Sequence, residues 1–207
     1  MKKSNLVLGS VLAVAAFSFS FASATLLQDA IQRGYDQGLT RYNTPSTFMA
    51  SNSLRRDEAS KFFVEFVDTQ EYYTDGGTNC AFSDVFKAIS DLQSYVKTSC
   101  EYGIFNGANG KFLPDQKLTN AQAVAVVVRI LNGKLSENGV HRADNYYTRA
   151  KELGLDISAF SNKEATTTRG DVMTLLYSAA TGEGADDDIV CTSVKQCLDQ
   201  LQDIMDE

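Results

Sequence analysis

The sequence repeats one pattern three times, and this repetition limits the folds open to the chain. Each copy has a helix-like stretch, a glycine followed by an apolar residue, a phenylalanine in the loop that follows, and a second helix. From the first to the second copy these last three marks shift by 65, 64 and 64 positions, and from the second to the third by 51, 48 and 49. Marks that move together predict stacked repeats with length changes confined to loops. The glycines are Gly38, Gly103 and Gly154, and the phenylalanines are Phe48, Phe112 and Phe160.

The second copy shows the local chemistry of the pattern most clearly. A helix is predicted from Lys87 to Tyr102, and Gly103 follows it where a left-handed residue closes a helix. The dipeptide Asn109-Gly110 predicts a tight turn, so the chain reverses direction. Two apolar residues of this otherwise polar loop are expected to turn inward, namely Ile104 and Phe112.

The second helix of this copy begins with a capping box. The Thr119 hydroxyl can accept from the backbone amide three residues on, while the Gln122 side chain reaches back. Three consecutive valines from 126 to 128 would alone suggest a strand, but the cap and the neighbouring alanines favour a helix. The stretch from Val124 to Leu131 is apolar on nearly every side, so this helix is expected at the centre of an all-α fold.

The N-terminus predicts export. Lys2 and Lys3 precede an apolar stretch that ends in small residues, which indicates a signal peptide over 1–24 with cleavage after Ala24. The alternative is an uncleaved anchor, because the apolar stretch is nearly long enough to span a bilayer. Removal of 1–24 changes the net charge from −7 to −9. An acidic protein of this kind repels nucleic acid and anionic lipid, so neither is an expected partner.

Four cysteines in an exported chain favour disulfides over metal ligation. We expect Cys80 to pair with Cys100, since they flank one predicted helix, and Cys191 to pair with Cys197. The second pairing requires Cys191 to precede the last helix, because cysteines six apart within one helix are too distant to bridge. Free buried thiols are the alternative.

The second copy resembles the S-layer homology (SLH) domain over its whole motif. The matching segments are Phe-x-Asp-Val at 82–85, Gly-Ile at 103–104, Gly107, Gly-x-Phe-x-Pro at 110–114 and Leu-Thr-x-Ala-Gln at 118–122. The three copies cover almost all of the chain after residue 24. The resemblance implies a pseudo-threefold spindle with the capped helices in the middle. It also implies grooves between repeats that bind cell-wall polysaccharides, often through anionic substituents.

The resemblance also implies the binding residues. The motif arginine corresponds to Arg56 and Arg169, whereas the second copy has Asn120, which can bond a sugar hydroxyl but cannot neutralise an anion. The alternative for both arginines is a solvated ion pair with the acidic residue nearby. The motif tryptophan is absent, and Tyr95, Tyr146 or Tyr147 would serve as a sugar platform or pack in the core. The complete set of expected ligand-binding residues is Arg56, Glu58, Thr119, Asn120, Gln122, Thr168, Arg169 and Asp171.

The sequence lacks the common catalytic and cofactor motifs, so an enzyme is not expected. The single histidine, His141, lies in a polar linker and is expected to be solvated. The run Asp186-Asp187-Asp188 does not predict calcium, because the twelfth position of an EF-hand loop would be Cys197. No metal or cofactor is expected. A last helix from about Ser193 to Met205 is expected to pack against a repeat.

We therefore expect five segments: a signal peptide (1–24), repeat 1 (25–73), repeat 2 (80–133), repeat 3 (143–182) and an acidic helical tail (183–207). The expected function is a secreted, non-catalytic cell-surface protein that binds wall polysaccharide through the grooves between repeats. The alternative is a structural or assembly subunit, or an adaptor, that acts through contacts with other surface-layer proteins or with itself.

Overall fold

The computed structural model describes residues 26–72, 76 and 79–182. This part of the chain is helical and contains no β-strand, so the fold is all-α, as the sequence predicts. A first helix covers residues 26–36. The helices that follow are α2 (Pro45–Phe48), α3 (Arg56–Gln70), α4 (Gln93–Glu101), α5 (Asn120–Asn132), α6 (Asp144–Glu152) and α7 (Arg169–Thr181), with short 3-10 turns η1 (Val85–Lys87), η2 (Ser90–Leu92) and η3 (Ser158–Phe160).

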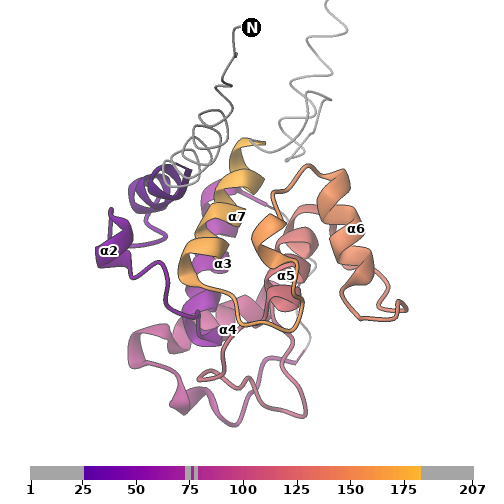
Figure 1. The fold of residues 1–207 in the computed structure, drawn as a ribbon. Helices are drawn as coiled ribbons and strands as arrows, with labels where there is room; N and C mark the ends of the chain where they lie inside the picture. The colour runs from indigo at the N-terminus through magenta and orange to yellow at the C-terminus, as the bar shows by residue number, and fades with distance from the viewer. Residues whose placement is uncertain (1–25, 73–75, 77–78, 183–207) are drawn as a thin grey trace, which may run out of the picture.

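The second helices of the three repeats, α3, α5 and α7, form the middle of the molecule (Figure 1). The first helices flank them: residues 26–36 lie to one side, α4 packs against α3, and α6 packs against α5. The predicted burial of α5 is confirmed, because Val124, Val127 and Val128 are fully buried. Apolar side chains on nearly all sides of a helix are stable only when other elements cover them, which explains the central position of α5.

A ring of three backbone hydrogen bonds joins the repeats just before their central helices. Leu54 N donates to Thr167 O at 3.0 Å, Thr167 N to Leu118 O at 2.9 Å, and Leu118 N to Leu54 O at 2.9 Å. These residues occupy the same place in the three repeats, immediately before the N-cap, and all three are fully buried. The entry to each central helix is therefore fixed by the other two repeats.

Each central helix also begins against the loop of another repeat. The first N–H of the helix donates to a loop carbonyl: Arg56 N to Gln116 O at 2.9 Å, Asn120 N to Ala165 O at 2.9 Å, and Arg169 N to Asn52 O at 2.8 Å. These amides lack partners inside the helix, so the neighbouring loop satisfies them. The central helix of repeat 1 thus begins at the loop of repeat 2, that of repeat 2 at the loop of repeat 3, and that of repeat 3 at the loop of repeat 1.

The loop of repeat 2 has the predicted conformation. Asn109 and Gly110 both have positive φ, and Ala108 and Lys111 exchange two backbone hydrogen bonds across them. The Asp84 carboxylate accepts from the N–H groups of Phe112 and Leu113 at 2.8 and 3.0 Å. Burial raises the pKa of Asp84, but these two backbone N–H groups outweigh it and hold the pKa below its usual value. The acidic residue of the Phe-x-Asp-Val segment therefore organises the loop.

The predicted helix from Lys87 to Tyr102 is wrong at its start. The segment instead forms η1 and η2, and the α-helix begins only at Gln93. The backbone is extended at Ala88 and Ile89, with ψ of 153° and 135°, which breaks the helix, and Ile89 N donates from this extended segment to the Asp57 carboxylate of repeat 1 at 3.1 Å.

The predicted disulfide between Cys80 and Cys100 is present, with a Cα–Cα distance of 5.5 Å. It ties the segment that enters repeat 2 to the end of α4. The predicted signal peptide, the acidic tail with its last helix and the Cys191–Cys197 pair lie outside the described residues.

Candidate functional site

The residues expected to bind ligand gather at the starts of the three central helices. The capping box predicted in repeat 2 is present, and repeat 3 has an equivalent one. Thr119 Oγ1 accepts from Gln122 N at 3.3 Å, and Gln122 Oε1 accepts from Thr119 N at 3.2 Å. Thr168 Oγ1 accepts from Asp171 N at 3.1 Å, and Asp171 Oδ2 accepts from Thr168 N at 3.3 Å. These four side chains are therefore engaged in forming the helix starts.

Arg56 occupies the first position of α3 and reaches the loop of repeat 2. Its Nε donates to Phe112 O at 3.0 Å, and its guanidinium carbon lies 4.9 Å and 5.0 Å from the ring centroids of Phe105 and Phe112. No ion pair joins Arg56 to a carboxylate within the described part of the chain. Burial lowers the pKa of Arg56, and the negative charge of Asp84 offsets this only in part. The site therefore holds a partly desolvated cation that makes no ion pair there.

Arg169 has the same position in repeat 3 and reaches the loop of repeat 1. Its Nε donates to Phe48 O at 2.9 Å, and its guanidinium carbon lies 4.8 Å from the Phe48 ring centroid. In contrast to Arg56, its Nη1 donates to Glu58 Oε1 at 2.7 Å, and the two side chains are only 15% and 22% exposed. The charge of Arg169 is therefore paired inside the protein.

One substitution between repeats explains this difference. Glu58 is the third residue of α3, and the third residue of α5 is Gln122. Arg169 contacts Phe48 and Glu58 of repeat 1, while Arg56 contacts Phe112 of repeat 2, 64 positions after Phe48. The residue 64 positions after Glu58 is Gln122, which carries no charge. Because repeat 2 has an amide there, Arg56 lacks a carboxylate partner within residues 26–72, 76 and 79–182.

Asn120 is a structural residue at the remaining junction. It is 5% exposed, and its Nδ2 donates to Asn162 O at 2.9 Å. The cation near this junction is Lys163, which pairs with Asp144 and lies 4.9 Å from the Tyr147 ring centroid. Asn120 is thus engaged within the protein and hardly accessible.

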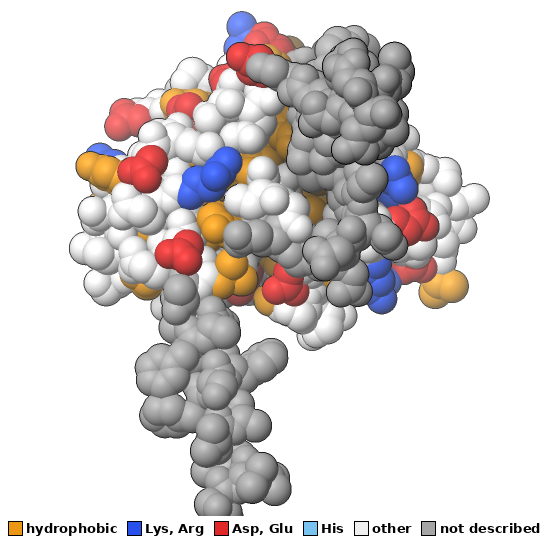
Figure 2. All heavy atoms as spheres, turned by 90° about the horizontal axis from the view of Figure 1, so that it is seen from above, with side chains coloured by type: hydrophobic (Ala, Val, Ile, Leu, Met, Phe, Trp, Pro, Cys, Tyr) orange, Lys and Arg blue, Asp and Glu red, His pale blue; other side chains and the backbone are white. Residues whose placement is uncertain are grey.

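The acidic and basic side chains on the upper face of the molecule are interspersed, with no single large basic patch (Figure 2).

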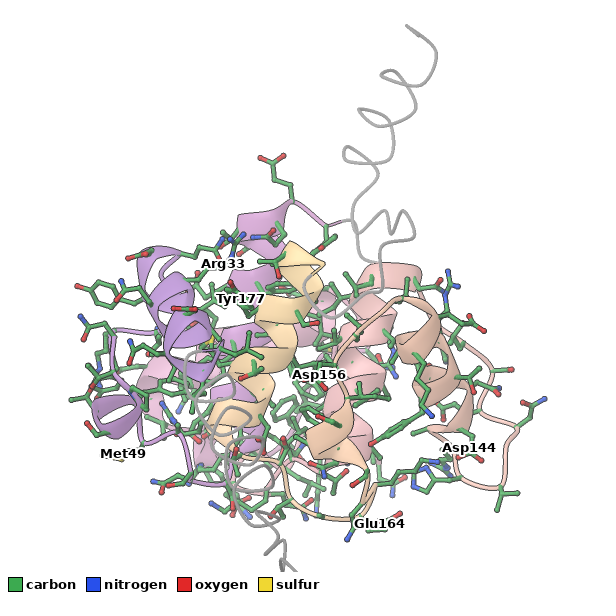
Figure 3. The ribbon with its side chains drawn as sticks, turned by 45° about the horizontal axis from the view of Figure 1, so that its top comes forward. Arg33, Met49, Asp144, Asp156, Glu164 and Tyr177 are labelled. Atoms are coloured by element: carbon green, nitrogen blue, oxygen red, sulfur yellow. A yellow bond between two sulfur atoms is a disulfide. The ribbon has the colours of Figure 1, made fainter. Side chains whose placement is uncertain are left out.

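A groove of about 970 Å³ lies between repeats 3 and 1, and in Figure 3 two of its lining residues, Met49 and Asp156, stand on either side of α7. Thr168 and Asp171 also line this groove, and no lysine, arginine or histidine does so among the described residues. Its chemistry suits a neutral or cationic group better than an anion.

The tyrosines considered as sugar platforms belong to the core or make internal hydrogen bonds. Tyr146 is fully buried, Tyr147 is 9% exposed and donates to Phe160 O at 2.8 Å, and the Tyr95 hydroxyl donates to Glu65. Packing within the protein, and not a role as a sugar platform, therefore fits all three tyrosines. The most exposed aromatic among the described residues is Phe86, at 72%, which sequence reasoning did not single out because nothing in its local pattern distinguishes it from a buried residue.

The expectation that His141 is merely solvated is wrong. Its Nε2 lies 2.8 Å from Glu164 Oε1, and its Nδ1 accepts from Ala143 N at 3.0 Å. The ring therefore connects the linker before repeat 3 to the loop of that repeat.

Within the described residues no cluster of side chains is suited to hold a metal ion. The same residues include no helix long and apolar enough to span a membrane.

The chain matches no protein-family model and no curated protein sequence. The site must therefore be interpreted from its own geometry.

Proposed function

We propose that this protein is a non-catalytic binder of an anionic cell-wall polysaccharide and that Arg56, at the junction of repeats 1 and 2, binds the acidic group. The observation that carries the proposal is that Arg56 makes no ion pair among the described residues, whereas its equivalent, Arg169, is neutralised by Glu58. The Arg56 guanidinium is held by the hydrogen bond of its Nε and by two aromatic rings. Little side-chain freedom is therefore lost when its remaining N–H groups donate to a carboxylate.

The resemblance to the SLH domain supports this proposal. In that family the motif arginine contacts wall polymer in a groove between repeats. The cyclic hydrogen bonding of Leu54, Leu118 and Thr167, and the regular placement of the motif arginines over loop phenylalanines, are what such a threefold assembly requires. Secretion and a location at the cell surface are part of the same proposal.

The proposal assigns anion binding to fewer residues than were expected from the sequence. Arg56 is the anion contact, while Arg169 and Glu58 stabilise the junction of repeats 3 and 1. Thr119 and Gln122 hold the start of α5 at the edge of the Arg56 site, and Asn120 is nearly buried. Thr168 and Asp171 line the groove between repeats 3 and 1, where uncharged parts of a glycan would fit better than its acidic groups.

Co-sedimentation with isolated wall fragments tests the function. The protein without residues 1–24 should bind, and Arg56→Gln should weaken binding by about tenfold, the loss expected when one charge-assisted bidentate contact disappears. Arg41→Gln removes the same charge from an exposed side chain that lies over Tyr42, and it should bind like the wild type. Equal retention of the wild type and Arg56→Gln, with both proteins folded by thermal melting, would refute the assignment.

A further inference from the structure

The segment 84–89 of repeat 2 crosses beside Arg56 and is anchored on both sides of it. At one end the Asp84 carboxylate holds the N–H groups of Phe112 and Leu113, and the carbonyl of the same Phe112 accepts from Arg56 Nε. At the other end Ile89 N donates to the carboxylate of Asp57, the residue that follows Arg56. At one end the segment is thus bonded to Phe112, which contacts Arg56, and at the other end to Asp57, which follows Arg56 in the chain.

This segment also exposes apolar surface. Only five large hydrophobic side chains are exposed in the described part of the chain, and two of them, Phe86 at 72% and Ile89 at 47%, lie in this short stretch. Ala88, between them, is 6% exposed and faces inward. Large apolar side chains left in water cost free energy unless a ligand or partner covers them, so paired exposure of this kind marks an interaction surface.

The backbone of the segment is fixed, so Phe86 is held in place. Lys87 N donates to Asp84 O at 3.0 Å, Ala88 N to Val85 O at 2.9 Å, and Leu92 N to Ile89 O at 2.8 Å. Two residues of chain span at most about 7 Å, which limits the distance between the Cα atoms of Phe86 and Asp84. An exposed aromatic ring therefore belongs to a fixed segment whose two ends bond to neighbours of Arg56, a cation with no carboxylate partner among the described residues.

We propose that Phe86, supported by Ile89, is a stacking platform for a sugar ring of the polymer whose acidic group binds Arg56. An aromatic face packs against the apolar face of a pyranose, and the neighbouring cation selects the sugar that bears a carboxylate. The positive charge of Arg56 favours an acidic glycan over a neutral one. This inference rests on the proposed function, and it adds a residue that recognises the ring rather than the charge.

Two polymer probes separate the two roles. The first is wall polysaccharide released from isolated walls, and the second is the same material after its carboxyl groups have been reduced to alcohols. Phe86→Ala should weaken binding of both probes by about fivefold, because the sugar ring is present in both. Arg56→Gln should weaken binding of the native probe only. Phe86→Tyr, which keeps the ring, should bind like the wild type.

Val140→Ala provides the matched control, since Val140 is a fully exposed apolar residue in the linker between repeats 2 and 3. If Phe86→Ala binds both probes like the wild type while Arg56→Gln loses the native probe, the platform is refuted and the proposed function stands. If neither variant changes the binding of either probe, both proposals fail. If Phe86→Ala instead abolishes self-association measured by sedimentation velocity and leaves polymer binding intact, Phe86 is a contact between copies and the platform is likewise refuted.

Discussion

Arg169 Nη1 donates to Glu58 Oε1 at 2.7 Å, which joins the first residue of α7 to the third residue of α3. The two residues are 111 positions apart in the sequence. Glu58 also accepts from Arg55 N at 3.0 Å through its other oxygen, so one carboxylate closes its own helix start and neutralises the arginine of another repeat. Where Gln122 replaces this carboxylate, Arg56 has no carboxylate partner in the part of the chain that the structure describes.

We predict that Gln122→Glu gives Arg56 the partner that Arg169 already has. One carboxylate oxygen would still accept from Thr119 N, and the other would face the Arg56 guanidinium, as in repeat 1. The free energy of unfolding should rise by about 0.5 kcal/mol and binding of an acidic polymer should fall about tenfold. Gln70→Glu, which adds the same charge at the far end of α3, should leave binding unchanged. Undiminished binding by Gln122→Glu would show that the Arg56 cation is not the anion site.

We predict that Thr167→Val stabilises the fold. Thr167 is fully buried, and its hydroxyl has no hydrogen-bond partner within the described residues. Valine keeps the shape and removes the unsatisfied group, so urea unfolding should show a gain of about 1 kcal/mol. Thr168→Val is the matched comparison, since that hydroxyl caps α7, and its loss should cost about 1 kcal/mol. Two neighbouring threonines should thus respond in opposite directions, and a loss of stability in both variants would contradict the assignment.

We predict that Asp57→Ala is strongly destabilising. The Asp57 carboxylate is fully buried and accepts from Arg55 Nε and Nη2, from Glu58 N and from Ile89 N. Its removal leaves these donors unpaired, so the free energy of unfolding should fall by about 3 kcal/mol. Asp91→Ala removes an exposed carboxylate from η2 and should change stability by less than about 0.5 kcal/mol. A similarly small effect at both positions would argue against the anchoring of the 84–89 segment by Asp57.

We predict a loss of stability in alkali that depends on Tyr147. Burial raises the pKa of Tyr147 to about 12. An unfolded tyrosine titrates near pH 10, so above this pH the unfolded chain releases a proton that the folded chain retains. The contribution is fully present below about pH 10 and is lost as the pH rises towards about 12. Urea unfolding between pH 9 and pH 11.5 should therefore show a shallower decline for Tyr147→Phe than for the wild type, and parallel profiles would contradict this.

The features that the sequence predicts well are those determined within one repeat. The capping box from Thr119 to Gln122 and the turn at Asn109-Gly110 depend on neighbours a few residues away, and both are confirmed. The predicted burial of Phe112 is also confirmed, because an apolar side chain in such a loop turns inward. The Cys80–Cys100 disulfide was also predictable because both residues flank one helix.

The features that the sequence misses depend on contacts between repeats. The helix predicted from Lys87 fails because the backbone is extended at Ala88 and Ile89, where Ile89 N donates to Asp57 of another repeat. The unequal states of Arg56 and Arg169 could not be predicted from their own motifs, since each depends on the third helical residue of a different repeat. His141 looked solvated because Glu164, its partner, lies 23 positions further along the chain.

The ring of hydrogen bonds among Leu54, Leu118 and Thr167 has a consequence for how the chain folds. Its last bond joins residues that are 113 positions apart, so the ring cannot close until all three repeats have formed and met. Contacts between distant parts of a chain slow folding because loop closure costs entropy before the contact stabilises anything. We therefore expect the arrival of repeat 3 to be a slow step of folding, and a chain without repeat 3 would leave Leu54 N and Asn120 N without the carbonyl groups of Thr167 and Ala165.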